Sequence, residues 1–491
     1  MKQLLYCLTV LFITSCFAQD TKTQIETTIT SDVIKGHIYF LADDLLKGRE
    51  TGTPENKIAA AYLANQLRTY GVNPNPETGD FYQEVKLQKE SAPTTLELKL
   101  NDVSIKNLVA LSSSNVDFSG NAMYLGYGLE EDYSGQDTKG KVLLIKAGSE
   151  DTKDARASFR LRSQKEELAQ KHGALAIIEF LDAKDNMWTF IDHNFNEPRL
   201  SVAKNNASED SKELTYIWVQ DLGADLISEV STNKKSQVTL KTSTKLLSNV
   251  TSQNVVGIVE GTDPQLKNEY IIYSAHYDHV GIGTPDETGD TIYNGARDNA
   301  VGTTTVLSMA EHLAKHPTKR SALFILFTGE EKGLLGSQYY VDNPILPLNQ
   351  MVYCFNSDNA GYNDKSLATI IGLPRTTAEQ HIKNAAKTFG ITAVDDPAPE
   401  QGLFDRSDNV HFAKKGIPSP TFSLGFTAFN GDVTKYYHRP GDEADSLDYD
   451  YLEQFFRAYV MAGVLIGNDP VTPTWTKGDK YEEAAKELYG N

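Results

Sequence analysis

The sequence has very little cysteine. Its 491 residues include three cysteines, Cys7, Cys16 and Cys354. Two of them lie near the start of the chain and the third stands in the apolar run "MVYCFN", so disulfides cannot be what stabilises the fold. We expect Cys354 to be an unreactive residue of a hydrophobic core.

The chain is also poor in positive charge. Lys and Arg number 47 against 66 Asp and Glu, which gives a formal net charge of -19 and a pI near 5.0. A surface that binds nucleic acid needs lysine and arginine in local excess, and the sequence has no basic run of that kind. These features argue against a nucleic-acid partner and leave acidic enzymes and binding proteins open.

Long hydrophobic runs are absent beyond the N-terminus, since no later segment reaches the ~18 apolar residues of a transmembrane helix. The opening "MKQLLYCLTVLFITSCFAQD" has a lysine, an apolar stretch and a small-residue end, which is the layout of a secretory signal. We expect residues 1–18 to be a signal peptide cut after Ala18, which predicts an exported protein, periplasmic or extracellular. The segment "ITSC" also resembles a bacterial lipobox, which would place a lipid anchor at Cys16.

Apolar and aromatic residues are plentiful enough to bury large cores, at 40% hydrophobic content with 20 Phe and 24 Tyr. At roughly 100–200 residues per domain, the chain should hold two or three domains. Its pattern changes along the chain: residues 19–93 are mainly helical, 94–250 are strand-rich with one clear helix at "SQKEELAQKHGA", 251–470 alternate apolar runs with helical segments, and 471–491 form a polar tail. This alternation predicts an α/β fold, with a mainly parallel mixed sheet covered by helices on both faces.

Polar residues follow three of the apolar runs. His276 and Asp278 follow "YIIYSA", Glu330 and Glu331 follow "LFILFTG", and Asp358 follows "MVYCFNS". Because ligands bind outside the carboxyl ends of the strands in such sheets, these side chains should meet at one rim.

Two further candidates lie in turns of the same region, Asp298 in "NGARDNAVGT" and His438 in "YYHRPGD". Two histidines and three carboxylates form a mixed nitrogen and oxygen set that suits zinc better than magnesium or calcium. If Asp298 gives one oxygen to each of two ions, each ion has three protein ligands and an open position, as in two-metal hydrolases. The five residues in this set are His276, Asp298, Glu331, Asp358 and His438.

The ordered segments "HYDH", "NGARDNAVGT", "FTGEEKGLLGS", "NSDNAG" and "YYHRPGD" resemble the co-catalytic dizinc exopeptidase family that contains secreted bacterial leucyl-type aminopeptidases and glutamate carboxypeptidases. "LADDLLKGRETGTPENKIAAAYLANQLRTYGV" is similar to that family's opening helices, and "YLGYGLEEDYSGQDTKGKVLLIKAG" resembles the protease-associated (PA) domain often inserted in it. The resemblance implies a zinc peptidase catalytic domain at 251–470, its N-terminal helical part at 19–93 and a PA-like insert at 94–250.

The same resemblance implies two Zn²⁺ per chain bound by the five residues above, with Asp298 shared. The family pattern pairs His276 with Asp358 and Glu331 with His438, a pairing that the residues alone leave open.

It also implies roles for three other side chains. Glu330 would be the general base, Asp278 the carboxylate that holds the His276 tautomer, and Tyr437 a donor to the developing oxyanion. The sequence departs from the family at "RSDN", where Asn409 replaces a histidine, which leaves Arg406 and Asp408 as candidate pocket residues.

Together with the export signal, the resemblance implies a secreted aminopeptidase that cleaves the N-terminal bond of peptide substrates. A carboxypeptidase of the same family would add an arginine clamp for the substrate's carboxylate, and a non-catalytic binding protein would be expected to have lost metal ligands. Glutaminyl cyclases share the fold with one zinc, and the presence of both His276 and Asp298 counts against that alternative. Arg297, directly before Asp298, either tunes the site or faces solvent.

Overall fold

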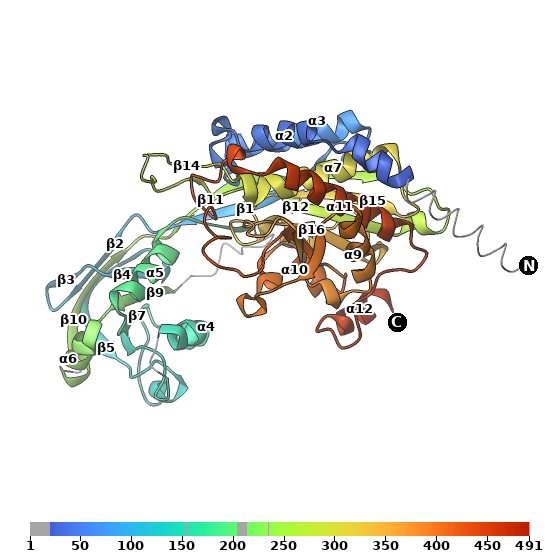
Figure 1. Ribbon diagram of the computed structural model, residues 1–491. Helices are drawn as coiled ribbons and strands as arrows, with labels where there is room; N and C mark the ends of the chain where they lie inside the picture. Colours follow the sequence, from blue (N-terminus) through green and yellow to red (C-terminus); the bar gives the residue numbers. More distant parts are fainter. Residues whose placement is uncertain (1–19, 153–154, 204–213, 234, 491) are drawn as a thin grey trace, which may run out of the picture. The chain divides into compact units, whose positions relative to one another are not determined.

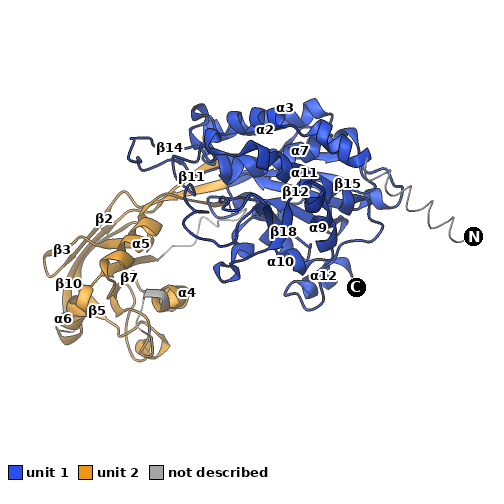
Figure 2. Cartoon of the chain, viewed as in Figure 1, with its two compact units in different colours: residues 1–86, 251–491 blue, residues 87–250 orange. Residues whose placement is uncertain are grey.

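The computed structural model describes residues 20–152, 155–203, 214–233 and 235–490, and the chain divides into two compact units (Figure 2). The first comprises residues 1–86 and 251–491 and the second residues 87–250. The chain passes between them within β1 (Tyr82–Ser91) and β11 (Leu246–Val259). The predicted signal peptide and the predicted lipid anchor at Cys16 lie outside the described residues.

The first unit holds most of a nine-stranded mixed sheet with the order β18-β17-β19-β16-β12-β15-β11-β1-β8. Its centre, β15-β12-β16-β19, is parallel, while β11 and β17 join it antiparallel. The strands are β12 (Tyr270–His276), β15 (Ser321–Phe327), β16 (Met351–Ser357), β17 (Leu367–Ile371), β18 (Thr392–Asp395) and β19 (Thr421–Leu424), and a hairpin joins β13 (Gly281–Ile282) and β14 (Ile292–Tyr293). The central strands are buried almost throughout, which is why they appear in the sequence as continuous apolar runs.

Helices cover both faces of this sheet (Figure 1). They are α2 (Ser31–Leu41), α3 (Pro54–Tyr70), α7 (Gly302–Lys315), α8 (Leu335–Asp342), α9 (Glu379–Thr388), α10 (Asn409–Lys414), α11 (Tyr449–Asn468) and α12 (Glu482–Tyr489). Alternate side chains of β12 point to opposite faces. Ile271 and Tyr273 pack in the core formed with α2, α3, α7, α9 and α11, whereas Ile272 packs in the core formed with α8 and α10. The predicted α/β class is confirmed.

Cys354 is fully buried in the second of these cores, next to β12 and α10. Burial raises the pKa of its thiol to about 12, so the reactive thiolate is not formed near neutral pH. The structure thus agrees with an inert core role for this cysteine.

The second unit is built on an eight-stranded sheet with the order β3-β2-β10-β5-β6-β7-β9-β4. Its strands are β2 (Leu96–Leu100), β3 (Val103–Ile105), β4 (Leu108–Ser112), β5 (Val116–Tyr124), β6 (Val142–Lys146), β7 (Ala176–Leu181), β9 (Thr215–Gln220) and β10 (Lys235–Thr242), while β8 (Arg199–Val202) pairs with β1. The helices α4 (Ala155–Lys171), α5 (Asp185–Asn196) and α6 (Asp225–Asn233) accompany them. The sequence predicts only α4, because the Asn, Asp and aromatic residues of α5 have weak helix propensity and its helix depends on burying Trp188 and Ile191.

Among the described residues, no helix combines the length and the apolar character needed to cross a bilayer.

Candidate metal centre

Polar side chains gather where three neighbouring parallel strands end. His276 is the last residue of β12, Glu330 and Glu331 follow β15, and Asp358 follows β16. Since β12 lies between β15 and β16, these four residues meet at one rim of the sheet, where the sequence places them.

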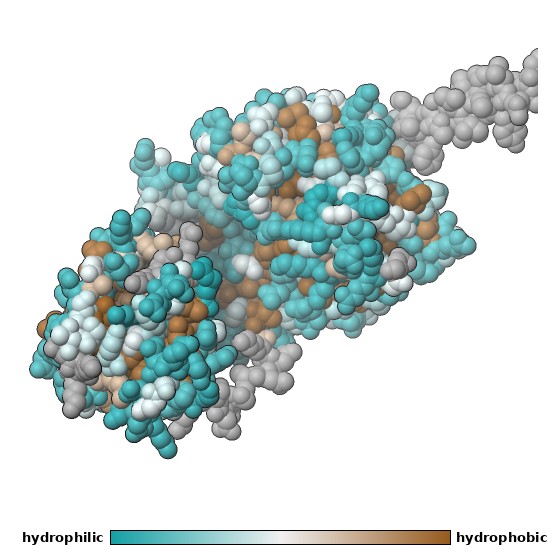
Figure 3. All heavy atoms as spheres, turned by 90° about the horizontal axis from the view of Figure 1, so that it is seen from below, coloured by the Kyte–Doolittle hydropathy of each residue, from teal (hydrophilic) through white to brown (hydrophobic). Residues whose placement is uncertain are grey.

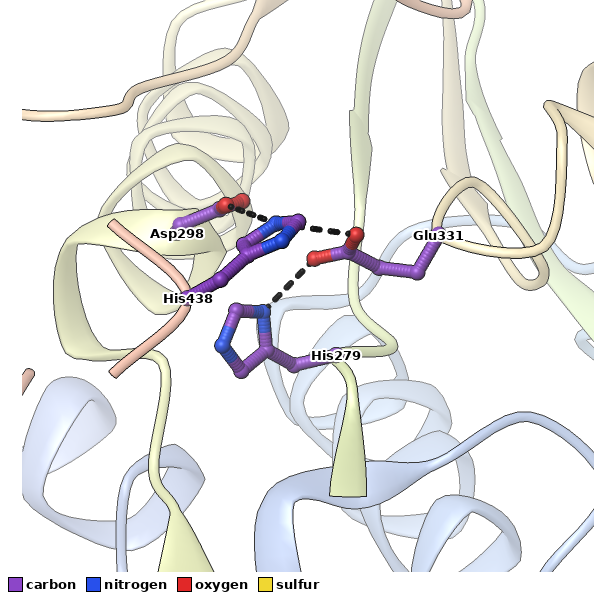
Figure 4. A group of neighbouring side chains, drawn as sticks. All are labelled: His279, Asp298, Glu331 and His438. Carbon is purple, nitrogen blue, oxygen red and sulfur yellow. Dashed lines mark hydrogen bonds and ion pairs between the residues drawn. The ribbon is translucent and has the colours of Figure 1, made fainter. Parts of the chain in front are cut away.

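Two other elements bring Asp298 and His438 to this rim. Asp298 lies in a π-helical turn (Ala296–Val301) directly before α7, and His438 lies in the loop between β19 and α11. A Cβ at Gly302 would stand 2.4 Å from the carbonyl oxygen of Ser357, so only glycine lets the start of α7 approach the end of β16 this closely. Figure 4 shows the side chains of Asp298, Glu331, His438 and His279 turned toward one another.

Asp298 belongs to two clusters of nitrogen and oxygen donors. In the first, His276 Nε2 lies 3.3 Å from Asp298 Oδ1 and 3.3 Å from Asp358 Oδ1. In the second, His438 Nε2 lies 3.2 Å from Asp298 Oδ2 and 3.1 Å from Glu331 Oε2. Each oxygen of Asp298 therefore faces a different histidine and a different second carboxylate.

These distances fit zinc ligands. Bonds of about 2.0 Å to a tetrahedral ion put neighbouring ligand atoms about 3.3 Å apart, close to the separations in both clusters. His438 Nε2 is buried and forms no hydrogen bond with a described residue although two carboxylate oxygens lie within 3.2 Å of it. An ion bound between the three atoms would satisfy this nitrogen, so the donor set present fits zinc.

The electrostatics of the centre favour the ionised forms of Asp298 and Glu331. Burial opposes the charge of Asp298, but contacts with His276 and His438 hold the pKa of this carboxyl well below its usual range. Burial likewise opposes ionisation of Glu331, and Asp298 adds to this effect, yet His279 and His438 lower its pKa to about 2.

Glu330 and Glu331 differ in position although they are adjacent. Glu331 Oε2 faces His438, whereas Glu330 lines the cavity beside Asp298 and Asp358. The nearest approach of Glu330 to His276 Nε2 is 4.0 Å, outside the range of the ligand pairs. Burial, followed by the charges of Asp358 and Glu331, raises the pKa of Glu330 well above its usual value.

Asp278 lies behind His276, but it holds the ring differently from the sequence prediction. The acceptor for His276 Nδ1 is the main-chain carbonyl of Asp278 at 3.2 Å, and the Asp278 carboxylate is 3.8 Å away. That carboxylate instead accepts hydrogen bonds from the Thr51 hydroxyl and from the main-chain N–H groups of Glu330 and Glu331. A residue two positions beyond a strand end can offer its backbone as well as its side chain, which spacing alone does not reveal.

Tyr437 lines the same cavity, and its ring stacks on His438 with centroids 4.0 Å apart. Burial and then the charge of Asp298 raise the pKa of its hydroxyl, so this group stays protonated and can donate a hydrogen bond. This is the state that the sequence-based role requires.

The cavity beside Glu330 has a volume of about 90 Å³ and one apolar wall. That wall is formed by Ile371, Leu403, Phe426 and Phe429.

Arg406, one of the two residues singled out in "RSDN", also lines this cavity. Asp408 is fully buried, and burial raises its pKa to about 7, while Asn409 donates to the carbonyl oxygens of Phe404 and Ser419. Of the three residues, only Arg406 lines this cavity.

Arg297 does not face solvent. It is 4% exposed, and its guanidinium contacts the Asp442 carboxylate at 2.9 Å and lies 4.1 Å from the centre of the Tyr436 ring. Asp442 also accepts hydrogen bonds from the main-chain N–H groups of Arg297 and Asp298. The pair therefore fixes the backbone of the shared aspartate, and the sequence reasoning missed Asp442 because it lies far along the chain.

Arg49 is a second residue that the sequence reasoning missed. This side chain is 1% exposed and donates to main-chain carbonyl oxygens of Tyr277 at 2.8 Å, Asn294 at 2.6 Å and Gly295 at 3.1 Å, and also to that of Leu41. The first of these lies between His276 and Asp278, and the next two precede Asp298. One buried guanidinium thus ties together the two loops that carry the first cluster.

His279 completes the second cluster. It is fully buried, and its Nδ1 lies 2.7 Å from Glu331 Oε1, the oxygen that does not face His438 (Figure 4). A proton on Nδ1 would leave Glu331 Oε2 free for an ion and fix the orientation of the carboxylate. The signal was present in the sequence, since "HYDH" ends in this histidine just after the strand.

Replacing His279 by leucine is expected to weaken zinc retention by about 10- to 100-fold, because Glu331 would lose the donor that orients it. The His279→Asn variant places an amide nitrogen near the position of Nδ1 and should retain most of the affinity. Competition with a zinc chelator measures both, and the melting temperatures of the metal-free proteins reveal any general loss of stability. Equal retention in the leucine variant and the wild type would contradict this role.

The region that carries the candidate ligands is similar to known peptidases. Residues 254–462, which contain all five candidate ligands, match the model of Peptidase family M28. The chain is 26% identical over 433 residues to aminopeptidase YwaD of Bacillus subtilis (strain 168), covering 85% of this chain and 82% of that protein. It is 25% identical over 333 residues to leucine aminopeptidase 2 of Arthroderma otae, covering 63% and 59%.

A solved structure shares the fold. The aminopeptidase from Aneurinibacillus sp. strain AM-1 superposes with a TM-score of 0.56 at 22% identity, covering 92% of this chain and 98% of that one. The model of Peptidase family M28 thus matches the part of the chain that carries the candidate ligands, and the similarity to YwaD extends over most of both chains.

Proposed function

We propose that this protein is an exported dizinc aminopeptidase that hydrolyses the N-terminal peptide bond of peptides. The observation that carries the proposal is the position of Asp298, with one carboxylate oxygen in each of two histidine–carboxylate clusters. Relatives named as aminopeptidases support the exopeptidase class. Export rests on the sequence pattern of residues 1–18.

Bound zinc would supply an activated water and would polarise the scissile carbonyl. The first ion would be held by His276, Asp298 and Asp358, and the second by Asp298, Glu331 and His438.

The remaining steps belong to side chains that line the cavity. Glu330 lines the cavity and approaches His276 Nε2 only to 4.0 Å, so its carboxylate can take the proton of the attacking water and pass it to the leaving amine. The protonated Tyr437 hydroxyl can donate to the substrate carbonyl oxygen as negative charge develops there. The apolar wall formed by Ile371, Leu403, Phe426 and Phe429 would receive the side chain of the N-terminal residue.

A carboxypeptidase of the same family is the second candidate, and one observation favours it. Arg406 is exposed and lines the cavity, so it could pair with a substrate carboxylate. If it is such a clamp, Arg406→Ala should abolish cleavage of N-blocked peptides that have a free C-terminus.

The test is a panel of peptides with free or blocked ends, assayed with the zinc content measured. An aminopeptidase should cleave N-free, C-blocked peptides, lose activity on chelation and regain it with zinc. Cleavage confined to N-blocked, C-free peptides would establish the carboxypeptidase instead. A protein that binds no zinc and cleaves neither set after zinc or cobalt is added would be the non-catalytic alternative.

A further inference from the structure

The second unit has a surface groove of about 640 Å³. All residues that line it belong to this unit, whereas the residues of the metal centre belong to the first unit. The groove runs between α4 and α5, and Trp218 of β9 also lines it. The face of the protein in Figure 3 is largely hydrophilic, with hydrophobic residues in small groups. The groove is one place where apolar side chains converge, since Phe159, Phe190, Ile191 and Phe195 all line it.

Two of these side chains are unusually exposed. Phe159 is 58% and Phe190 64% exposed, although each could lower its free energy by burial. Exposed aromatic residues gathered on one surface, rather than scattered singly, indicate a binding site. The two phenylalanines come from different helices, α4 and α5, so their proximity is a product of the fold and not of local sequence.

One side of the groove is rigid. Trp218 is 1% exposed, and its indole N–H donates to Glu179 Oε2 at 2.6 Å. The same oxygen accepts the Tyr216 hydroxyl at 2.6 Å, while Lys165 neutralises the other oxygen at 2.6 Å. The Trp218 ring also meets Phe195 edge-on, with centroids 5.7 Å apart. A groove backed by a side chain fixed in this way is preformed, so the protein loses little entropy when a ligand binds.

The charged residues that line the groove are positive and favour a negatively charged ligand. Arg160 and Arg199 line it, and no acidic residue of the described chain does, although the whole protein carries a net charge of -19. Local positive charge in an acidic protein favours a ligand with carboxylates. Asn186 and Asn194 add side-chain amides, which suit the backbone of a peptide.

We propose that this groove binds an acidic peptide segment, with an aromatic side chain of the peptide packed against Phe159 and Phe190 and neighbouring carboxylates paired with Arg160 and Arg199. The proposal is independent of the metal centre and adds a peptide-binding site to the second unit. Arginine stacks on aromatic rings and forms bidentate contacts with carboxylates. The two arginines can therefore contact both the aromatic side chain and the carboxylates of the peptide.

Fluorescence anisotropy with the full-length protein tests this directly. The probe is a labelled Asp-Phe-Asp-Asp peptide with both ends blocked, so that it cannot be an exopeptidase substrate. It should bind, and binding should weaken with added salt and when lysine replaces each aspartate or alanine replaces the phenylalanine. Equal affinity for the lysine peptide would overturn the proposal.

Matched variants locate the site. The Phe159→Ser/Phe190→Ser double variant should raise the Kd at least about tenfold, as expected for removal of aromatic anchors. Val103→Ser is the control, because Val103 is 64% exposed in the same unit but does not line the groove. An unchanged Kd in the double variant would refute the site. Concentration-dependent dimers that only this variant abolishes would show that a second copy of the chain occupies the groove, which would also overturn the proposal.

Discussion

Replacing Glu330 by glutamine is expected to leave the zinc content unchanged and to lower kcat by about 10²- to 10⁴-fold, the range for loss of a general base. Glutamine has the same size but cannot take up a proton. Its position predicts no loss of metal, since Glu330 approaches His276 Nε2 only to 4.0 Å while the ligand pairs lie at 3.1 to 3.3 Å. Steady-state kinetics and elemental analysis of the same preparation measure both quantities.

The adjacent Glu331→Gln variant is the matched comparison. Glu331 lies 3.1 Å from His438 Nε2 and 2.7 Å from His279 Nδ1, so the change removes charge from the second cluster itself. Zinc should then be lost first and activity as a consequence. If the two variants keep the same zinc content and the same residual activity, the assignment of one base and one ligand is wrong.

The five candidate ligands can be proposed from the sequence because three of them lie at the ends of recognisable strands. His276 ends one buried parallel strand, and Glu331 and Asp358 follow the ends of two others, whose carboxyl ends must share one rim. Asp298 and His438 stand in turns, and their motifs gain meaning only as members of an ordered set. The geometry of the structure is consistent with all five as ligands.

The residues that orient these ligands are not accessible to the same reasoning. Arg49 acts on main-chain carbonyl groups more than two hundred positions away, and Asp442 on Arg297 and Asp298 across a separation of about 145 residues. Within the described part of the chain, Arg49 donates only to main-chain carbonyl oxygens, and every residue has such an oxygen. The sequence therefore contains no acidic partner from which the role of this arginine could be recognised. The fold class could be predicted from strand burial, but these supports depend on loops whose conformation the sequence pattern does not determine.

Replacing Asp298 by asparagine is expected to have the largest effect on the metals. One oxygen of this carboxylate lies in the cluster with His276 and Asp358, and the other lies in the cluster with Glu331 and His438. Asparagine keeps the shape but has one oxygen, and its amide nitrogen cannot serve as a ligand. Both clusters are disturbed at once, because the variant loses one of the two carboxylate oxygens and a negative charge that faces both histidines.

The Asp358→Asn variant isolates this effect, since Asp358 contacts only the first cluster. We expect it to lose one zinc, whereas Asp298→Asn should fall below it in zinc content and in kcat/KM, by about 10⁴-fold or more relative to the wild type. Elemental analysis, zinc titration of the metal-free proteins and thermal unfolding distinguish metal loss from misfolding. An Asp298→Asn protein that retained two zinc ions would rule out a carboxylate shared between the ions. A lower zinc content in Asp298→Asn than in Asp358→Asn is the result expected if one carboxylate serves both ions.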